Sequence, residues 1–219
     1  FWQLLGEAYY QRGSLNPAIN CFIKSLNMAE QKHDAHDISI QSACTYSRLR
    51  MSDIRLSVGH LDEAMSGYSD IVKNDSKNLA ALVGLSKTEL QTARNSFSSN
   101  LIKTGHQHCM SALKYALMAI KLKPNLCLTW KLASDCCMIQ FVYGQRGEFD
   151  TKLDIEFPGS QDDGLTIDRQ TCIDLAQQLL SKAIAIESFE HSACLWHNLG
   201  MSLYMKSTLI KDEKSPERI

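Results

Sequence analysis

The chain lacks an excess of either charge and has no long apolar run. Among its 219 residues, 23 lysines and arginines stand against 24 aspartates and glutamates, which gives a formal net charge of −1. Domains that bind nucleic acid usually carry a basic excess or a basic stripe. No segment approaches the ~20 apolar residues that a membrane-spanning helix requires. We therefore expect neither direct nucleic-acid binding nor a membrane span.

Cysteine is present, but the spacing of a zinc site is absent. No C-x-x-C pair occurs, so the usual zinc-knuckle arrangement is excluded. Most of the cysteines fall in apolar stretches with helical periodicity, where a free cysteine behaves as a small hydrophobic residue. We expect reduced core thiols in a cytoplasmic protein, with a nuclear location as the alternative. The eight positions are Cys21, Cys44, Cys109, Cys127, Cys136, Cys137, Cys172 and Cys194.

Motifs that would indicate an enzyme are also missing. The sequence contains no G-x-x-x-x-G-K-[ST] phosphate loop, no G-x-S-x-G nucleophile elbow and no H-E-x-x-H helix. Acidic residues are frequent between Glu148 and Asp163, but no D-x-D-x-[DN]-G run accompanies them. A solvated loop is therefore favoured over a calcium site or a catalytic carboxylate pair. We expect no enzymatic activity, no catalytic residues and no cofactor.

Histidine and cysteine come close together at three places that could suggest a metal site. His191, Cys194 and His197 lie at i, i+3 and i+6, but they overlap the start of a repeat helix, so structural roles are favoured. The other two groups are His33 with His36, and His106 with His108 and Cys109. Residues at i and i+2 point to different helix faces, which weakens the last group further. We expect no metal.

What the sequence does contain is an internal helical repeat. Trp2, Leu5, Gly6 and Tyr9 stand at the spacing W-x-x-L-G-x-x-Y, and the pattern A-x-x-x-F follows at residues 18–22. These are the residue types and the spacing of tetratricopeptide repeats (TPRs), in which two helices form each unit. Trp2, Leu5 and Tyr9 lie at i, i+3 and i+7 and so share one helix face. Gly6 permits close approach of the second helix.

The turn between the two helices of the first unit is also indicated by its residues. Gly13 suits a turn that requires a positive φ. Asn16 and Pro17 then predict the N-cap and the first residue of the second helix.

The pattern recurs along the chain with decreasing fidelity. Residues 59, 64 and 68 repeat residues 13, 18 and 22 at a constant offset of 46, which is longer than the TPR period of about 34 residues. The surplus falls in the polar stretch 31–42. The later units are marked by Ala112, Ala116 and Ala119, by Trp130 with Ala176, Leu180 and Ala183, and by Trp196.

These observations predict an all-α TPR solenoid, with antiparallel helix pairs in a right-handed superhelix. Phe1 already lies inside a helical pattern, so we expect a piece of a longer array. The residues from about 144 to 166 are rich in glycine, proline and acid and predict an inserted surface loop. The predicted units are 1–30, 43–76, an extended unit 78–124, 126–187 around that acidic loop, and 192–209 as the first helix of a fifth repeat.

One face of each first helix is expected to line the concave groove of the solenoid. Exposed apolar residues there would suit capture of a partner peptide, although a neighbouring coil of the same solenoid could equally cover them. The three tryptophans, at 2, 130 and 196, share one repeat position, which indicates core packing rather than a ligand cage. The candidate partner-binding residues are Gln3, Glu7, Tyr10, Leu49, Asp53, Leu56, Lys131, Asp135, Met138, His197, Met201 and Tyr204.

One order of segments is more specific than the general repeat. Residues 2–9 are followed by Leu-Val-Gly-Leu-Ser at 82–86, by an extended helix ending in Ala-Leu-Met-Ala at 116–119, and by Leu-Thr-Trp-Lys-Leu-Ala-Ser-Asp-Cys at 128–136. The long insert comes next. This order resembles the TPR scaffold subunits of superkiller (Ski) complexes. The resemblance covers nearly the whole chain, and its specific part is 82–136 with the following insert.

The resemblance implies a protein-interaction scaffold in a cytoplasmic assembly with an RNA helicase and WD-repeat subunits. That assembly delivers mRNA to the exosome for 3′-to-5′ decay, and the helicase would supply ATP hydrolysis and RNA contact. Two alternatives stay open. One is a TPR adaptor of an unrelated pathway, a chaperone cofactor or a transport subunit, that binds a partner peptide in its concave groove. The other is a superhelix that contacts RNA through basic residues clustered on one face.

Overall fold

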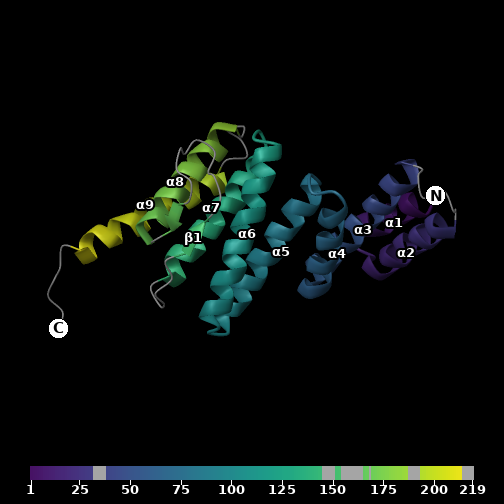
Figure 1. Ribbon diagram of the computed structural model, residues 1–219, viewed down its shortest axis with the longest axis horizontal. Coiled ribbons are helices and arrows are strands. Elements are labelled where there is room, and N and C mark those ends of the chain that lie inside the picture. Colours follow the sequence, from purple (N-terminus) through teal and green to yellow (C-terminus); the bar gives the residue numbers. More distant parts are fainter. Residues whose placement is uncertain (32–37, 145–150, 154–164, 168, 187–192, 214–219) are drawn as a thin grey trace. The chain divides into compact units, whose positions relative to one another are not determined.

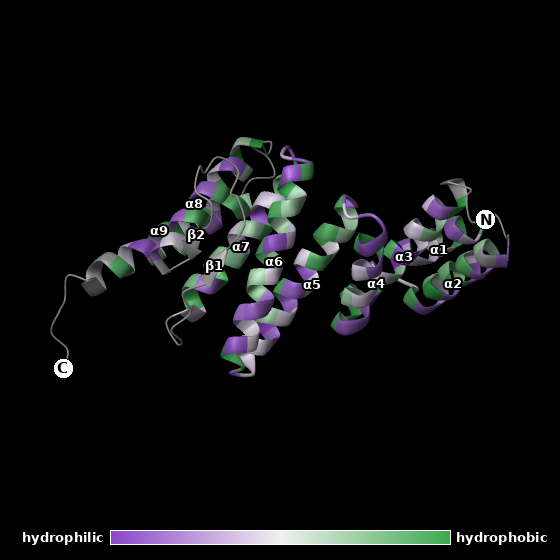
Figure 2. Cartoon of the chain, in the orientation of Figure 1, coloured by the Kyte–Doolittle hydropathy of each residue, from purple (hydrophilic) through white to green (hydrophobic). Residues whose placement is uncertain are grey.

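A computed structural model describes residues 1–31, 38–144, 151–153, 165–167, 169–186 and 193–213 of the chain (Figure 1). The chain divides into two compact units, Phe1–Thr88 and Glu89–Ile219, and each is considered by itself. Helices dominate both units. Hydrophobic and hydrophilic residues mix along the helical ribbons (Figure 2), as is usual for helices that bury one face and expose the other.

The first unit is built from helices. These are α1 (Trp2–Gln11), α2 (Leu15–Gln31), α3 (Ile38–Val58), α4 (Leu61–Asn74) and the first part of α5 (Leu79–Ser98). Helix α2 packs against both α1 and α3, and α3 packs against α4. Residues 38–42, which the sequence analysis assigned to a polar insert, already belong to α3.

Glycine ends the first helix of each pair in this unit. Gly13 and Gly59 have φ values of 75° and 90°, so the positive φ predicted for Gly13 is confirmed. The amide of Ser14 donates to the Tyr9 carbonyl at 2.9 Å, and the amide of His60 donates to the Arg55 carbonyl at 2.9 Å. These hydrogen bonds satisfy carbonyls that the helix end would otherwise leave unpaired. A side chain at either glycine would strain the backbone.

The predicted start of α2 is wrong. Its first residue is Leu15, and the amide of Ala18 donates to the Ser14 carbonyl at 3.1 Å, so Ser14 rather than Asn16 stands at the N-cap. The turn after α1 leads directly into α2, which leaves no room for two further loop residues. Pro17 still lies within the first turn, where a missing N–H costs no hydrogen bond.

The core of the first unit joins α1, α2 and α3. Phe22 is fully buried, and a Cβ built on Gly6 would lie 3.0 Å from its ring, which confirms the close approach expected at Gly6. Tyr68 and Ala64, the counterparts of Phe22 and Ala18, are fully buried as well. The core cluster is Ala18, Phe22, Met51 and Ile54, with Tyr9, Tyr10, Leu15, Ile19 and Leu26 packed against it.

The second unit contains the rest of α5, then α6 (Ile102–Leu122), α7 (Cys127–Tyr143), α8 (Arg169–Ile186) and α9 (Ala193–Glu213). Helix α7 packs against α6 and α8, and α8 packs against α9. The small and large residues that marked these repeats in the sequence are fully buried. They are Ala112, Ala116, Ala119, Ala176, Leu180 and Ala183.

The insert after α7 is not entirely a loop, which corrects the sequence analysis. Strand β1 (Thr151–Leu153) pairs antiparallel with β2 (Leu165–Ile167), with Lys152 opposite Thr166. Threonine and isoleucine favour extended backbone, and three such residues fall in these two strands. The acidic stretches 145–150 and 154–164 lie outside the described residues.

The three tryptophans do not share one environment. Trp130 is 7% exposed, and its indole donates to the Pro124 carbonyl at 2.7 Å. Trp2 is half-buried under the Lys24 ammonium, 4.6 Å from the ring centre. Trp196 is 52% exposed, so the prediction that it is a core residue is wrong. Its helix α9 packs on α8, and within the described residues no further helix covers the opposite face.

All eight cysteines are reduced thiols, and five of them are buried. Burial raises the pKa of the Cys136 and Cys137 thiols well above the ordinary value, which keeps both protonated. Cys194, in contrast, is exposed. The described helices include none with both the length and the apolar character needed to cross a bilayer.

Candidate partner-binding surfaces

The predicted groove residues of α1 lie against α3. The Gln3 amide donates to the Ala43 carbonyl at 2.6 Å and to the Ser47 hydroxyl at 3.1 Å. Ser47 is fully buried. These bonds join the first helices of two successive repeats, through α3 residues that were not among the predicted ones. The side-chain amide of Gln3 therefore contributes to the packing of α1 on α3.

Arg50 is the centre of a charged and aromatic cluster on the same two helices. Its guanidinium lies 3.1 Å from Glu7 Oε1 and 3.4 Å from Asp53 Oδ2. It also lies over two aromatic rings, at 5.7 Å from Tyr10 and 5.4 Å from Tyr46. The Tyr46 hydroxyl donates to Glu7 Oε2 at 2.8 Å. The hydrogen bond with Tyr46, more than the two carboxylates, raises the pKa of Arg50, so the guanidinium stays charged.

A second tyrosine ties this cluster to α4. The Tyr68 hydroxyl donates to Asp53 Oδ1 at 2.5 Å. Burial, followed by this bond to a carboxylate, raises the pKa of Tyr68 far above its ordinary value, so the phenol remains a donor. The predicted residues Glu7, Tyr10 and Asp53 therefore hold α1, α3 and α4 together. Leu49 and Leu56 are half-buried beside them.

Sequence reasoning missed Tyr46, Arg50 and Tyr68 as members of this cluster. The available signal was spacing: Tyr46 and Arg50 are four residues apart, and Arg50 and Asp53 are three apart, so all three fall on one helix face. The contact with Glu7 could not be read in this way, because it spans 43 residues of sequence.

In the second unit the candidate residues divide into a paired set and an exposed set. The Lys131 ammonium lies 2.7 Å from Asp135 Oδ2, and the Asn198 amide donates to Asp135 Oδ1 at 3.2 Å. Asn198, which was not among the predicted residues, therefore links α9 to α7. Met138 is half-buried on α7.

Helix α9 carries several large exposed side chains among the described residues of the second unit. His197, Met201 and Tyr204 are all exposed, and they follow one another at i, i+4 and i+7 on one helix face. Tyr204 is 66% exposed and Leu203 is 54% exposed. Of the predicted groove residues, these three are the ones whose side chains remain open to a partner.

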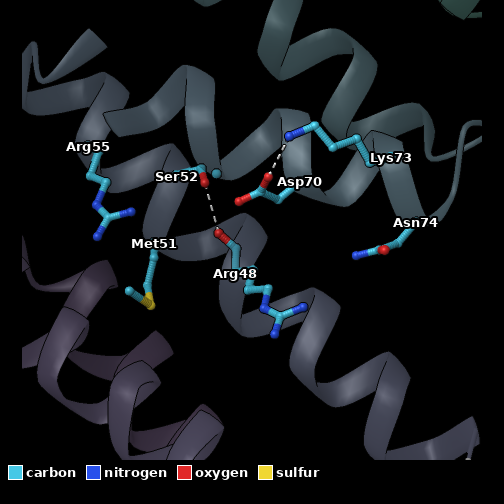
Figure 3. A pocket seen from close by; sticks show the side chains of 8 residues that line it. Arg48, Met51, Ser52, Arg55, Asp70, Lys73 and Asn74 are labelled. Carbon is cyan, nitrogen blue, oxygen red and sulfur yellow. Dashed lines mark hydrogen bonds and ion pairs between the residues drawn. The ribbon is translucent and has the colours of Figure 1, made fainter. Parts of the chain in front are cut away.

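A pocket of about 430 Å³ lies between α3 and α4 and was not anticipated from the sequence (Figure 3). Two of its cations are held by carboxylates, Arg55 by Glu63 at 3.2 Å and Lys73 by Asp70 at 3.1 Å. The lining residues are Arg48, Met51, Ser52 and Arg55 from α3, and Gly67, Asp70, Lys73 and Asn74 from α4.

The histidines do not form a metal site in the part of the chain that the structure describes. Within those residues, no three side chains of His, Cys, Asp or Glu gather as metal ligands. His106 is buried with its Nδ1 2.5 Å from the Gln140 amide, and His108 pairs with Glu89 at 2.6 Å. His33, His36 and His191 lie outside the described residues.

Comparison with known proteins supplies the remaining observation. No protein-family model matches the chain. It is 26% identical over 206 residues to tetratricopeptide repeat protein 37 of Xenopus laevis, and 24% identical over 210 residues to superkiller complex protein 3 of Homo sapiens. The chain resembles superkiller complex protein 3. The mouse protein of that name is 28% identical over 136 residues.

The alignments with superkiller complex protein 3 and its frog relative confirm the resemblance drawn from the repeat pattern. Each covers 94% of this chain. Together with the buried repeat positions, they confirm an all-α fold of TPR type. The chain spans 12% of the length of the human and frog proteins. What those whole proteins do therefore reaches this chain only as a proposal.

Proposed function

We propose that this chain is part of a protein-interaction scaffold of a cytoplasmic superkiller complex. The observation that carries the proposal is the similarity, over 94% of the chain, to proteins named for tetratricopeptide repeats and for that complex. Helical repeats suit such a role because each added pair extends a surface without needing a new fold. The role is structural rather than catalytic.

In this role the array holds an RNA helicase and WD-repeat subunits so that mRNA reaches the exosome for 3′-to-5′ decay. The helicase provides ATP hydrolysis and contact with RNA. The repeats provide rigid helix faces on which extended partner segments lie. The exposed row His197, Met201 and Tyr204 is the predicted contact in the second unit, because an aromatic and a thioether at helical spacing are typical anchors for a partner helix.

Affinity purification of the full-length parent protein tests this function. We expect an RNA helicase and a WD-repeat protein among the recovered partners, at near-stoichiometric amounts. Replacing the exposed α9 row by His197→Ala, Met201→Ser and Tyr204→Ser should reduce recovery of one of them. The control is Ile23→Ser with Met28→Ser, which changes exposed apolar residues of α2 instead. Recovery of chaperones or transport proteins, without helicase or WD-repeat subunits, would contradict the proposal and favour an adaptor of another pathway.

A further inference from the structure

Two of the α3 residues that line the pocket occupy the repeat positions that hold aromatic residues in the first helix pair. At the constant offset of 46 residues, Trp2 and Tyr9 of α1 correspond to Arg48 and Arg55 of α3. Leu5 and Gly6 correspond to Met51 and Ser52 by the same offset. The four α3 residues that line the pocket are therefore the four signature positions of this repeat, with both aromatic side chains replaced by arginine.

The second helix of the pair has changed in step. Cys21, which is buried in α2, corresponds to Gly67 of α4. A Cβ built on Gly67 would overlap the Ser52 hydroxyl, so the serine at the signature glycine position requires glycine opposite it. In the first pair Lys24 lies over the Trp2 ring, and its counterpart in the second pair is Asp70. With arginine in place of both aromatic residues and glycine at position 67, the space between α3 and α4 stays open as the pocket.

The lining of this pocket contains three cationic side chains and one carboxylate, and Met51 is its large apolar side chain. Arg48 is exposed, and in the described part of the chain its guanidinium has neither an ion pair nor a hydrogen-bond acceptor. Arg55 and Lys73 already have carboxylate partners, but Glu63, Asp70 and Lys73 are exposed, so those pairs exchange readily with another anion. In Figure 3, Met51 lies on the α3 side and Asn74 on the α4 side of the hollow.

We propose that this pocket binds an acidic side chain of a protein partner, with its carboxylate at Arg48 and Lys73 and an adjoining apolar group on Met51. Guanidinium pairs with carboxylate in a bidentate geometry, which suits Arg48. A nucleic-acid strand is disfavoured because it needs several cations in a row, whereas this hollow is small and contains Asp70. The proposal rests on the proposed scaffold function, since it names the chemistry of one partner contact.

Peptide binding to this chain tests the pocket directly. The probe is a fluorescein-labelled peptide, Gly-Glu-Asp-Leu-Glu-Gly, and its matched control has glutamine and asparagine in place of the acids. Fluorescence anisotropy should show saturable binding of the acidic peptide and binding of the amide peptide weaker by about tenfold or more. Arg48→Glu should abolish binding of the acidic peptide. The matched variant Arg94→Glu reverses another exposed arginine within a helix and should change affinity less than about twofold.

The variant Asp70→Asn tests the opposite prediction, an increase in affinity. It removes the carboxylate that competes for Lys73 and should strengthen acidic-peptide binding by about two- to fivefold. Circular dichroism checks the fold of each variant, and Arg48→Ala replaces Arg48→Glu if the charge reversal unfolds the chain. Equal binding of the amide peptide, an equal loss in Arg94→Glu, or tighter Arg48-dependent binding of oligouridylate would each overturn the proposal. Purification of partners with the full-length protein tests the scaffold function separately. A negative result in one experiment therefore does not decide the outcome of the other.

Discussion

Helices α7 and α9 each carry a tryptophan at the same repeat position and differ in what surrounds it. Trp130 of α7 is 7% exposed, whereas Trp196 of α9 is 52% exposed. Helix α7 has α6 on one side and α8 on the other, while α9 is packed on α8. In a helical repeat, a signature residue becomes a core residue only when a neighbouring pair covers it. Position in the repeat therefore predicts the type of residue but does not predict whether that residue is buried.

The two tryptophans give the largest expected difference. Trp130→Ala removes a buried indole and its hydrogen bond to the Pro124 carbonyl, so it should lower the free energy of unfolding by about 3–5 kcal/mol. Trp196→Ala should lower it by less than about 1 kcal/mol, because half of that side chain is already in water. Urea unfolding followed by far-ultraviolet circular dichroism measures both. Equal losses would break the comparison, since they would mean that α9 is covered after all.

Alanine substitutions at two glycines should change the stability of the chain in opposite directions. A Cβ at Gly105 of α6 would lie 2.7 Å from the Phe97 ring, and that ring is stacked on Tyr143 at 4.2 Å. Because the ring cannot move aside easily, Gly105→Ala should destabilise the chain by about 1–3 kcal/mol. Among the described residues, no atom beyond the local helix backbone lies within 4 Å of a Cβ at Gly200 of α9, so Gly200→Ala should stabilise the chain by about 0.5–1 kcal/mol through helix propensity. Thermal unfolding of both variants beside the parent decides the signs, and destabilisation by Gly200→Ala would show a close neighbour.

A further expected effect concerns the dependence of stability on pH, through His106 of α6. Burial lowers the pKa of His106 below its ordinary value of 6.5, against the opposing effect of the Gln140 hydrogen bond. The unfolded chain therefore takes up the proton first. The stabilisation from neutral His106 is complete above pH 6.5 and is lost as the pH falls through the lowered pKa, with a slope of at most about 1.4 kcal/mol per pH unit.

Urea unfolding at a series of pH values from 7.5 downward measures that loss. His106→Asn should remove this part of the pH dependence while lowering stability at neutral pH. The matched variant His197→Asn changes an exposed histidine of α9 and should leave the profile as it is in the parent chain. A profile that is unchanged in His106→Asn would contradict the assignment of the acid sensitivity to His106.

The first helix pair was predictable from the sequence because its signals are local. Gly13 adopts the expected positive φ, Gly6 approaches Phe22, and Ala18 is buried, since spacing along a helix fixes which residues share a face. The N-cap of α2 was misplaced because a helix start depends on the preceding turn as well as on the residue types. Strands β1 and β2 were missed because three-residue strands acquire their stability from pairing with each other.

The candidate surface was only partly predictable. The offset between repeats placed Glu7 and Asp53 in one row, and the structure joins both to Arg50. Which of the predicted partner-binding residues remain exposed was not predictable, because their exposure depends on contacts with other helices. Asn198 of α9 donates to Asp135 of α7, a contact across 63 residues of sequence that spacing within one helix does not specify.

Three features can be read from the sequence alone: the helical repeat, the small residues that let its helices approach, and the exchange of Trp2 and Tyr9 for Arg48 and Arg55 in the second pair. Those features lie in the order and spacing of residues along one helix. Only the tertiary structure decided that Trp196 is exposed, that Arg50 links α1 and α3, and that the exchanged arginines line a pocket. Burial and charge pairing depend on atoms from separate helices, and no spacing within one helix specifies them.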